Sequence, residues 1–311
     1  MEPFPSDLSG RLQSLLLHTL REGSLRLYAR ALTSFRCDLH DASVDWTRLS
    51  ELERDLFLAE YIAERSEGVG EKISTYTVII AALHKISPHQ RYKVALKALE
   101  AWRSQLPLRQ APAMPKIVLH AIVAMALVAD DPDFAGIALL CFEGLLRVGE
   151  AFALTWRDIV LDGDKLIVLL HLTKRGRQEQ VVVTCPYTIS LIAFLIRRRD
   201  HGDPEPLFNL SYGKVLRALR KYTAAAGLAA CDFTSHSWRR GGASELLAAG
   251  WLVDDICLRG RWASISSARL YLRRGEVYLN EFRAKADAQT WQRIQSFAKC
   301  LPRAVKPFSA T

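Results

Sequence analysis

Residues 236–271 read HSWRRGGASELLAAGWLVDDICLRGRWASISSARLY, and the interpretation of the whole chain starts from this stretch. His236 and Arg239 open it with two residues between them, and Trp262 comes nine residues before Tyr271. A histidine before a helix is often structural, so the His-x-x-Arg pattern alone is a weak signal. The spacing of the four residues together is what makes the stretch informative.

A helix is expected to begin beside His236. Asp232, Thr234 or Ser235 can cap it, so the histidine and arginine of the stretch would project from its first turn. Backbone amides and the helix dipole favour an anion at such a place. In the run Arg240-Gly241-Gly242-Ala243, the small residues after the arginine would let another backbone approach this helix closely.

Two further cations precede this stretch. Arg147 follows a largely apolar run, so it either pairs structurally with Glu150 or is a guanidinium fork held for a phosphate. We favour the phosphate fork, with Glu150 orienting it. Lys174 lies at the tip of an expected hairpin, where a solvent-exposed turn lysine is the ordinary interpretation.

Tyr271 is the candidate nucleophile, and Tyr278 is its rival. Core packing is the plainer interpretation of both. A phenol with a pKa of about 10 attacks poorly near neutral pH unless cations stabilise its phenolate character. Arg269, Arg273 and Arg274 are close to Tyr271 in sequence and could supply that charge.

Phosphoryl transfer needs positioned cations, a nucleophile and an acid for the leaving group. The chain holds a candidate for each role. The candidate set is Arg147, Lys174, His236, Arg239, Trp262 and Tyr271.

Composition is that of a globular protein, with 50% hydrophobic and 24% charged residues among 311. The longest apolar run, Ile117 to Ala129, is shorter than a membrane span and contains His120. The first residues lack the basic flank and apolar core of a secretory signal. We therefore expect an intracellular protein without a membrane partner, in the nucleus of a eukaryote or the cytoplasm and nucleoid of a bacterium.

No cofactor or metal is expected. The six cysteines are scattered, which indicates reduced and mostly buried thiols rather than disulfides or a zinc site. Residues 68–72, GVGEK, lack the Gly-Lys-Ser/Thr ending of a phosphate loop and are expected to terminate a helix. ATP, zinc and nicotinamide functions have no supporting motif.

Basic residues are concentrated after the first third of the chain. Through Ala113 there are 15 basic and 14 acidic residues, and from Met114 onward there are 27 and 19. A basic domain suits a polyanionic partner, because neutralised phosphates release counterions. Charge alone favours nucleic acid only weakly.

The first third predicts helices. Ser24 can cap one, and Ser50-Glu51-Leu52-Glu53 is a capping box for a second that ends near residues 68–70. Further helical patterns cover 75–86 and 90–103. Three prolines between Pro107 and Pro115 then predict a linker, since proline disfavours helix.

The remainder predicts a mixed domain, and the whole chain a mainly α (α+β) fold. Helices are expected at 116–128 and 133–146, both buried, followed by about three short antiparallel strands at 159–161, 166–170 and 180–183. Later helices are expected at 188–199, 212–226, 239–249, 253–259 and 277–299. The domain boundaries are 1–109, a linker at 110–115, and 116–311.

The spaced residue set resembles the tyrosine recombinase (phage-type integrase) family over nearly the whole chain. In that family the active site contains an Arg followed three residues later by an acid, a hairpin Lys, a His-x-x-Arg, a His or Trp, and a Tyr. Trp262 and the intervals around it look most like the Cre recombinase. The short chain is also similar to recombinases of eukaryotic mobile elements such as Cryptons.

The resemblance implies a helical core-binding domain and a mixed catalytic domain that close on double-stranded DNA as a C-shaped clamp. It implies strand exchange, for integration or excision, through a 3′-phosphotyrosyl intermediate without metal or ATP. Tyr271 would attack, Arg147 and Arg239 would hold the nonbridging oxygens, and Lys174 would protonate the leaving oxygen. His236 and Trp262 would assist by proton transfer and an indole N–H.

Neighbouring arginines are expected to contact DNA, namely Arg175, Arg177, Arg240, Arg261 and Arg273. A homo-oligomer is expected on DNA, with a dimer at each site and a tetrameric synapse. Its contacts could use the C-terminal helix, although packing of that helix within its own chain is equally open. Two alternatives remain: a type IB-like topoisomerase, and a domesticated DNA-binding protein that no longer cleaves.

Overall fold

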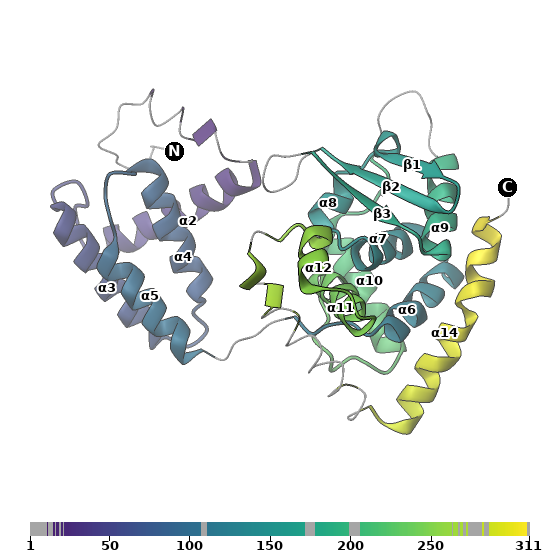
Figure 1. The fold of residues 1–311 in the computed structure, drawn as a ribbon. Coiled ribbons are helices and arrows are strands. Elements are labelled where there is room, and N and C mark those ends of the chain that lie inside the picture. Colours follow the sequence, from purple (N-terminus) through teal and green to yellow (C-terminus); the bar gives the residue numbers. More distant parts are fainter. Residues whose placement is uncertain are drawn as a thin grey trace. The chain divides into compact units, whose positions relative to one another are not determined.

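The computed structural model describes residues 22–106, 111–171, 178–198, 206–262 and 286–309, with single positions between 11 and 20 and between 264 and 282. The chain divides into two compact units, Met1–Arg109 and Gln110–Thr311 (Figure 1). Helices dominate both units, and the second also holds a small antiparallel sheet. The predicted fold class is confirmed.

The first unit is helical throughout its described part. Ser50 caps α3 through the predicted box, because its hydroxyl accepts the Glu53 N–H while the Glu53 carboxylate accepts the Ser50 N–H. The prediction that Ser24 caps a helix was wrong, because α2 already begins at Glu22. The described helices are α2 (Glu22–Asp41), α3 (Glu51–Ser66), α4 (Ile73–Ile86) and α5 (Lys93–Gln105).

These four helices enclose a core of their own. Helix α3 packs against α5, and α2 packs against α4, around side chains that include the fully buried Phe35. The Asp55 carboxylate of α3 accepts the N–H groups of Val94 and Ala95 at 3.0 and 2.9 Å. It thereby satisfies amides in the first turn of α5 that have no partner within that helix.

The second unit carries the sheet. Strands β1 (Ile159–Asp162), β2 (Lys165–Leu170) and β3 (Glu179–Val183) pair in that order and antiparallel, as the sequence predicted. Gly163 has a φ of 56°, a left-handed conformation that suits the turn between β1 and β2.

Helices surround a core that runs through the second unit. Helix α7 is almost wholly buried within it and helix α6 is mostly buried, as their apolar sequences predicted. No helix in the described part of the chain is long and apolar enough to cross a membrane. The helices are α6 (Lys116–Val128), α7 (Pro132–Glu143), α8 (Val148–Phe152), the 3₁₀ turn η1 (Trp156–Asp158), α9 (Pro186–Arg197), α10 (Tyr212–Ala225), α11 (Ser235–Ala248), α12 (Val253–Gly260) and α14 (Ala288–Ser309).

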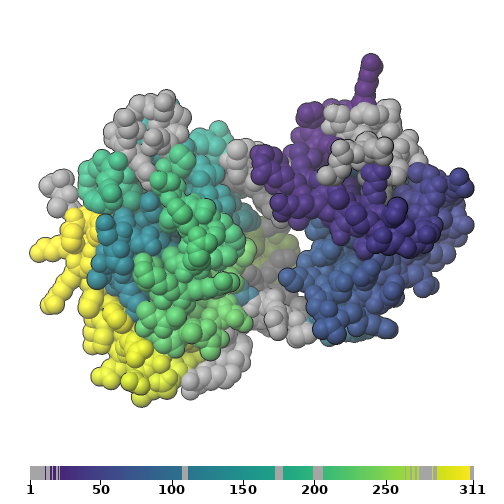
Figure 2. Space-filling model, turned by 180° about the vertical axis from the view of Figure 1, so that it is seen from behind, coloured from purple at the N-terminus to yellow at the C-terminus, as the bar shows by residue number. Residues whose placement is uncertain are grey.

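The C-terminal helix α14 covers 288–299 of the predicted span 277–299 and continues to Ser309, whereas residues 277–281 and 283–285 of that span lie outside the described residues. It packs along α6 and α9 of its own chain, with Ile294, Leu301 and Val305 buried. Figures 1 and 2 both show it along the outside of the second unit. The apolar face of α14 is thus covered within its own chain.

Candidate functional site

Local capping places the predicted histidine in the first turn of α11. Thr234 is the N-cap, and its hydroxyl accepts the His236 N–H at 3.2 Å. The Ser237 hydroxyl in return accepts the Thr234 N–H at 3.0 Å. Thr234 is therefore the residue, among the three candidates, that starts this helix.

Two glycines bring α11 against the rest of the unit. A Cβ at Gly241 would lie 2.0 Å from the Met114 carbonyl oxygen, and one at Gly242 would lie 2.0 Å from that of Phe142. The predicted close backbone approach is confirmed. Because α11 packs so closely, the Arg239 side chain reaches the loop that follows α7.

That loop holds Arg147 and Glu150 at the start of α8. The Glu150 carboxylate accepts the Arg147 backbone N–H at 2.8 Å and its guanidinium at 2.5 Å. The Glu150 side chain is 6% exposed, whereas that of Arg147 is 31% exposed. The acid therefore orients an arginine that still reaches solvent, as the sequence suggested.

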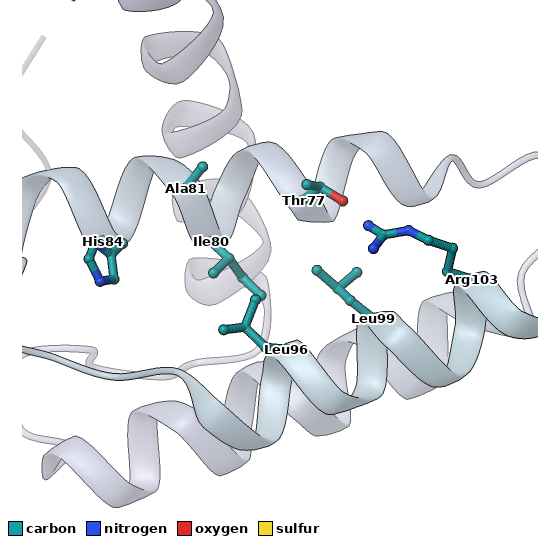
Figure 3. Close-up of a pocket in the computed structure, with 7 residues that line it drawn as sticks. All are labelled: Thr77, Ile80, Ala81, His84, Leu96, Leu99 and Arg103. Atoms are coloured by element: carbon teal, nitrogen blue, oxygen red, sulfur yellow. The ribbon is translucent and has the colours of Figure 1, made fainter. Parts of the chain in front are cut away.

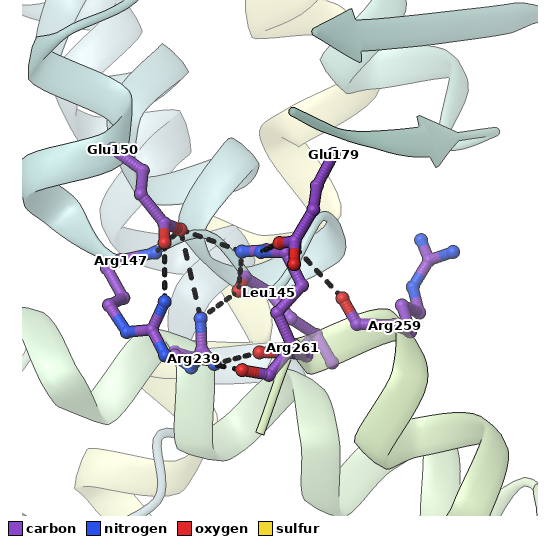
Figure 4. Close-up of polar contacts among 8 residues, drawn as sticks. Leu145, Arg147, Glu150, Glu179, Arg239, Arg259 and Arg261 are labelled. Carbon is purple, nitrogen blue, oxygen red and sulfur yellow. Dashed lines mark hydrogen bonds and ion pairs between the residues drawn. The ribbon is translucent and has the colours of Figure 1, made fainter. Parts of the chain in front are cut away.

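Arg239 is held by backbone carbonyls. Its guanidinium donates to the carbonyl oxygens of Leu145, at 2.5 Å, and of Gly260 (Figure 4). Its Nη1 is also 4.0 Å from the Glu150 carboxylate. The side chain is 4% exposed, so Arg239 supplies fixed, buried positive charge beside Arg147.

Trp262 lies over that buried charge. The Arg239 guanidinium carbon is 4.6 Å from the centroid of the Trp262 ring, a cation–π contact. A Cβ at Gly260 would lie 1.8 Å from a ring atom of Trp262. Only glycine leaves room at position 260 for the indole.

Arg261 faces inward, although the sequence suggested a DNA contact. Arg261 is 7% exposed and has a φ of 55° at the end of α12. Its guanidinium bonds Glu150 at 2.7 Å and the Leu145 carbonyl oxygen at 3.0 Å. This burial argues against the predicted DNA contact.

Arg240 also departs from the prediction. It is 3% exposed, and its guanidinium donates to the Ala111 carbonyl oxygen at 2.6 Å. Its position on α11, between residues that pack inward, turns it away from solvent. Arg240 therefore holds the segment before α6, and its burial argues against the predicted DNA contact.

The electrostatics of the site favour a charged acid and a neutral imidazole. Burial raises the pKa of Glu150, but the charge of Arg261 and the hydrogen bonds and charge of Arg147 lower it by more than burial raises it. The pKa of Glu150 therefore lies below its usual 4.5. Desolvation lowers the pKa of His236 below its usual 6.5, and the charges of Arg239 and Arg147 lower it again. Both arginines therefore act on the same imidazole.

The structure brings together Arg147, Glu150, His236, Arg239 and Trp262, which come from three separate segments of the chain. The buried roles of Leu145 and Arg261 were missed, and so was the partly buried carboxylate of Glu179, which lies 3.4 Å from Arg261 Nε. Leu145 has a φ of 49°, which turns its carbonyl toward two guanidinium groups, and no sequence signal marks that conformation. Lys174, Arg175, Arg177, Tyr271 and Arg273 lie outside the described residues.

The described residues contain no group of three or more His, Cys, Asp and Glu side chains arranged to hold a metal ion. A separate open groove of about 480 Å³ lies in the first unit, between α4 and α5 (Figure 3). It contains none of the predicted site residues. Its lining is Thr77, Ile80, Ala81, His84, Leu96, Leu99 and Arg103.

Comparison with known proteins identifies one protein family. A family model described as the phage integrase family matches residues 119–276, slightly more than half of the chain. No curated protein sequence gives a significant match.

Two solved structures are similar in fold. One is the XerH site-specific recombinase bound to a palindromic difH substrate in a post-cleavage complex, with a TM-score of 0.62 and 16% identity over 84% of this chain and 79% of that one. The other is the Tn1549 transposon integrase in complex with transposon right end DNA, with a TM-score of 0.59 and 12% identity over 89% of this chain and 99% of that one. At such identities the likeness concerns the fold alone.

Proposed function

Because this chain belongs to the phage integrase family, we propose that it carries out site-specific strand exchange on double-stranded DNA. One observation carries the proposal: α8 and α11 place Arg147 and Arg239 around one carboxylate, and both charges act on His236. Two positioned guanidinium groups suit a pentacoordinate phosphate transition state. The DNA-bound state of the similar recombinase and integrase structures supports the choice of substrate.

The proposed reaction is a transesterification. The Tyr271 hydroxyl oxygen bonds to the scissile phosphorus while the bond from phosphorus to the 5′ oxygen breaks. A 3′-phosphotyrosyl link forms, and Lys174 protonates the departing 5′ oxygen, which leaves as a 5′ hydroxyl. Attack by the 5′ hydroxyl of another strand then releases the tyrosine, so the energy of the phosphodiester is conserved.

The described residues suit their proposed roles. Arg147 is exposed enough to bond a nonbridging oxygen, and Arg239 adds buried charge beside it. His236 is neutral at neutral pH, because its pKa is lowered, so it can accept the Tyr271 proton. Trp262 would donate its indole N–H to the phosphate.

The test is capture of the covalent adduct. Fragmented genomic DNA is incubated with the protein, denatured, and the protein-linked 3′ ends are sequenced to obtain a site. A nicked suicide substrate with that site should then give a denaturation-resistant adduct with wild type and none with Tyr271→Phe.

Tyr278→Phe is the matched control and should still give the adduct. Loss in Tyr278→Phe with retention in Tyr271→Phe would move the nucleophile to Tyr278. Salt-sensitive binding with no adduct from any variant would instead indicate a non-cleaving DNA-binding protein. Relaxation of plasmids without the site by monomers would indicate a topoisomerase.

We further propose a dimer at each DNA site and a tetrameric synapse. Since α14 is covered in cis, these contacts would use other surfaces. Light scattering of the protein with and without the selected duplex measures the assembly, and a single protomer on a full site contradicts this proposal.

A further inference from the structure

Arg261 makes every described contact toward the interior of the second unit. Its Nη2 donates to the Glu150 carboxylate at 2.7 Å and to the Leu145 carbonyl oxygen at 3.0 Å. Its Nη1 donates to the Arg259 carbonyl oxygen at 2.9 Å. A planar guanidinium can hold several acceptors at once, whereas a lysine ammonium acts as a point charge.

Those acceptors are shared with the two arginines of the proposed site. Glu150 also binds the Arg147 guanidinium, and the Leu145 carbonyl oxygen also accepts from Arg239 (Figure 4). Arg147 in turn donates to the Arg261 carbonyl oxygen at 3.5 Å. A shift of Arg261 would therefore reach both neighbours through atoms they contact directly.

Glu179 at the start of β3 supplies the remaining counter-charge. Its carboxylate is 3.4 Å from the Arg261 Nε, an ion contact without hydrogen-bond geometry. Two carboxylates thus face Arg261, which is only 7% exposed. Their negative charges offset the free-energy cost of burying the guanidinium.

We propose that Arg261 is a positioning residue: it fixes Glu150 and the Leu145 carbonyl so that Arg147 and Arg239 hold the geometry needed for a scissile phosphate. The inference rests on the proposed strand-exchange function. Arg261 does not touch the DNA and acts only through its neighbours.

The first test needs no DNA. The titration midpoint of His236 is measured by NMR in the histidine-labelled full chain, with assignment by His236→Gln. Arg261→Lys keeps one positive charge but cannot hold all the acceptors. The pKa of His236 is lowered first by desolvation and then by the charges of Arg239 and Arg147. Arg261→Lys should move the His236 midpoint up toward 6.5, because those two arginines would no longer be held in place.

Arg259→Lys is the matched control. Arg259 belongs to the same segment and donates to the Glu143 carbonyl oxygen at 2.8 Å. It makes no described contact with Glu150 and should leave the midpoint unchanged. An unchanged midpoint in Arg261→Lys, with circular dichroism like that of wild type, overturns the proposal.

A double variant keeps the test possible if the single variant does not fold. If Arg261→Lys does not fold, Arg261→Met with Glu179→Gln removes one cation and one carboxylate together. The same upward movement of the His236 midpoint is expected, and its absence again overturns the proposal.

The second test uses the selected DNA substrate. Arg261→Lys should slow adduct formation about 100-fold with little change in DNA affinity, because a small misplacement of catalytic groups has an effect of that order. In a Glu150→Gln background the further loss on Arg261→Lys should largely disappear. Equal losses in both backgrounds would mean that Arg261 does not act through Glu150. If no variant or wild type forms an adduct, the proposed function fails while the NMR result still stands.

Discussion

Glu150 is the residue on which the charge balance of the site depends. Its carboxylate is bonded by Arg147 and Arg261 and lies 4.0 Å from Arg239. A buried carboxylate that lost these partners would be costly, and so would buried guanidinium groups that lost the carboxylate. Stability and site geometry therefore depend on the same side chain.

We predict that Glu150→Gln destabilises the second unit by about 3–5 kcal/mol at neutral pH, because it leaves buried arginines without their counter-ion. Urea unfolding measures the loss. Glu245→Gln, on a partly exposed residue of α11, is the control and should stay within about 0.5 kcal/mol of wild type. A similar loss in both variants would rule out a special role for Glu150.

The stability that the Glu150 carboxylate contributes to folding should also depend on pH. Its pKa is lowered by folding, so the carboxylate adds stability above its usual 4.5, and this is lost as the pH falls through the folded value. The difference in unfolding free energy between wild type and Glu150→Gln should therefore shrink in acid. A difference that grows as the pH falls below 4.5 would contradict the direction of the shift.

At the scale of the element, α11 matters most because its backbone touches two other segments. Gly241 faces the Met114 carbonyl and Gly242 faces that of Phe142. The backbone N–H of Met114 in turn donates to the Ser237 carbonyl oxygen at 3.0 Å. These contacts bring His236 and Arg239 to the loop that holds Arg147.

We predict that Gly241→Ala or Gly242→Ala destabilises the protein by about 1–3 kcal/mol or more, because a Cβ would overlap a backbone oxygen that cannot rotate away. Gly213→Ala in α10 is the matched control. A Cβ there meets only the end of the Arg217 side chain at 3.5 Å, so alanine should stabilise by about 0.4–1 kcal/mol. The measurement is the urea midpoint, and a stable Gly242→Ala would contradict the close approach.

At the scale of the whole molecule, each unit has its own buried core, and the charge is uneven between them. Through Ala113 the basic and acidic residues nearly balance, whereas from Met114 onward basic residues exceed acidic ones by 27 to 19. The excess is therefore in the unit that contains Arg147 and Arg239. A polyanionic substrate would be drawn mainly to that unit.

We predict that duplex binding weakens steeply with salt, by about 10³-fold or more between about 50 and 200 mM, since bound phosphates release counterions. Fluorescence anisotropy of a labelled duplex measures this slope. A duplex with a neutral methylphosphonate backbone is the control and should show a much flatter dependence. The same slope on both duplexes would exclude phosphate contacts as its source.

Most helices, the three-stranded sheet and the candidate site residues could be predicted from the amino-acid sequence. Capping boxes, alternating strands and the interval between His236 and Arg239 are local features, so neighbouring residues suffice to predict them. Thr234 and Glu150 do what their positions in the sequence suggested.

Which arginines face inward could not be predicted from the sequence and follows from how the segments pack together. Arg240 and Arg261 stand in a basic stretch that predicted contacts with DNA, yet both are buried. The partner that turns Arg261 inward, the Leu145 carbonyl, is 116 residues away and faces it only because Leu145 adopts a positive φ. The direction of a guanidinium depends on acceptors that folding brings from elsewhere in the chain, so its own sequence context cannot predict it.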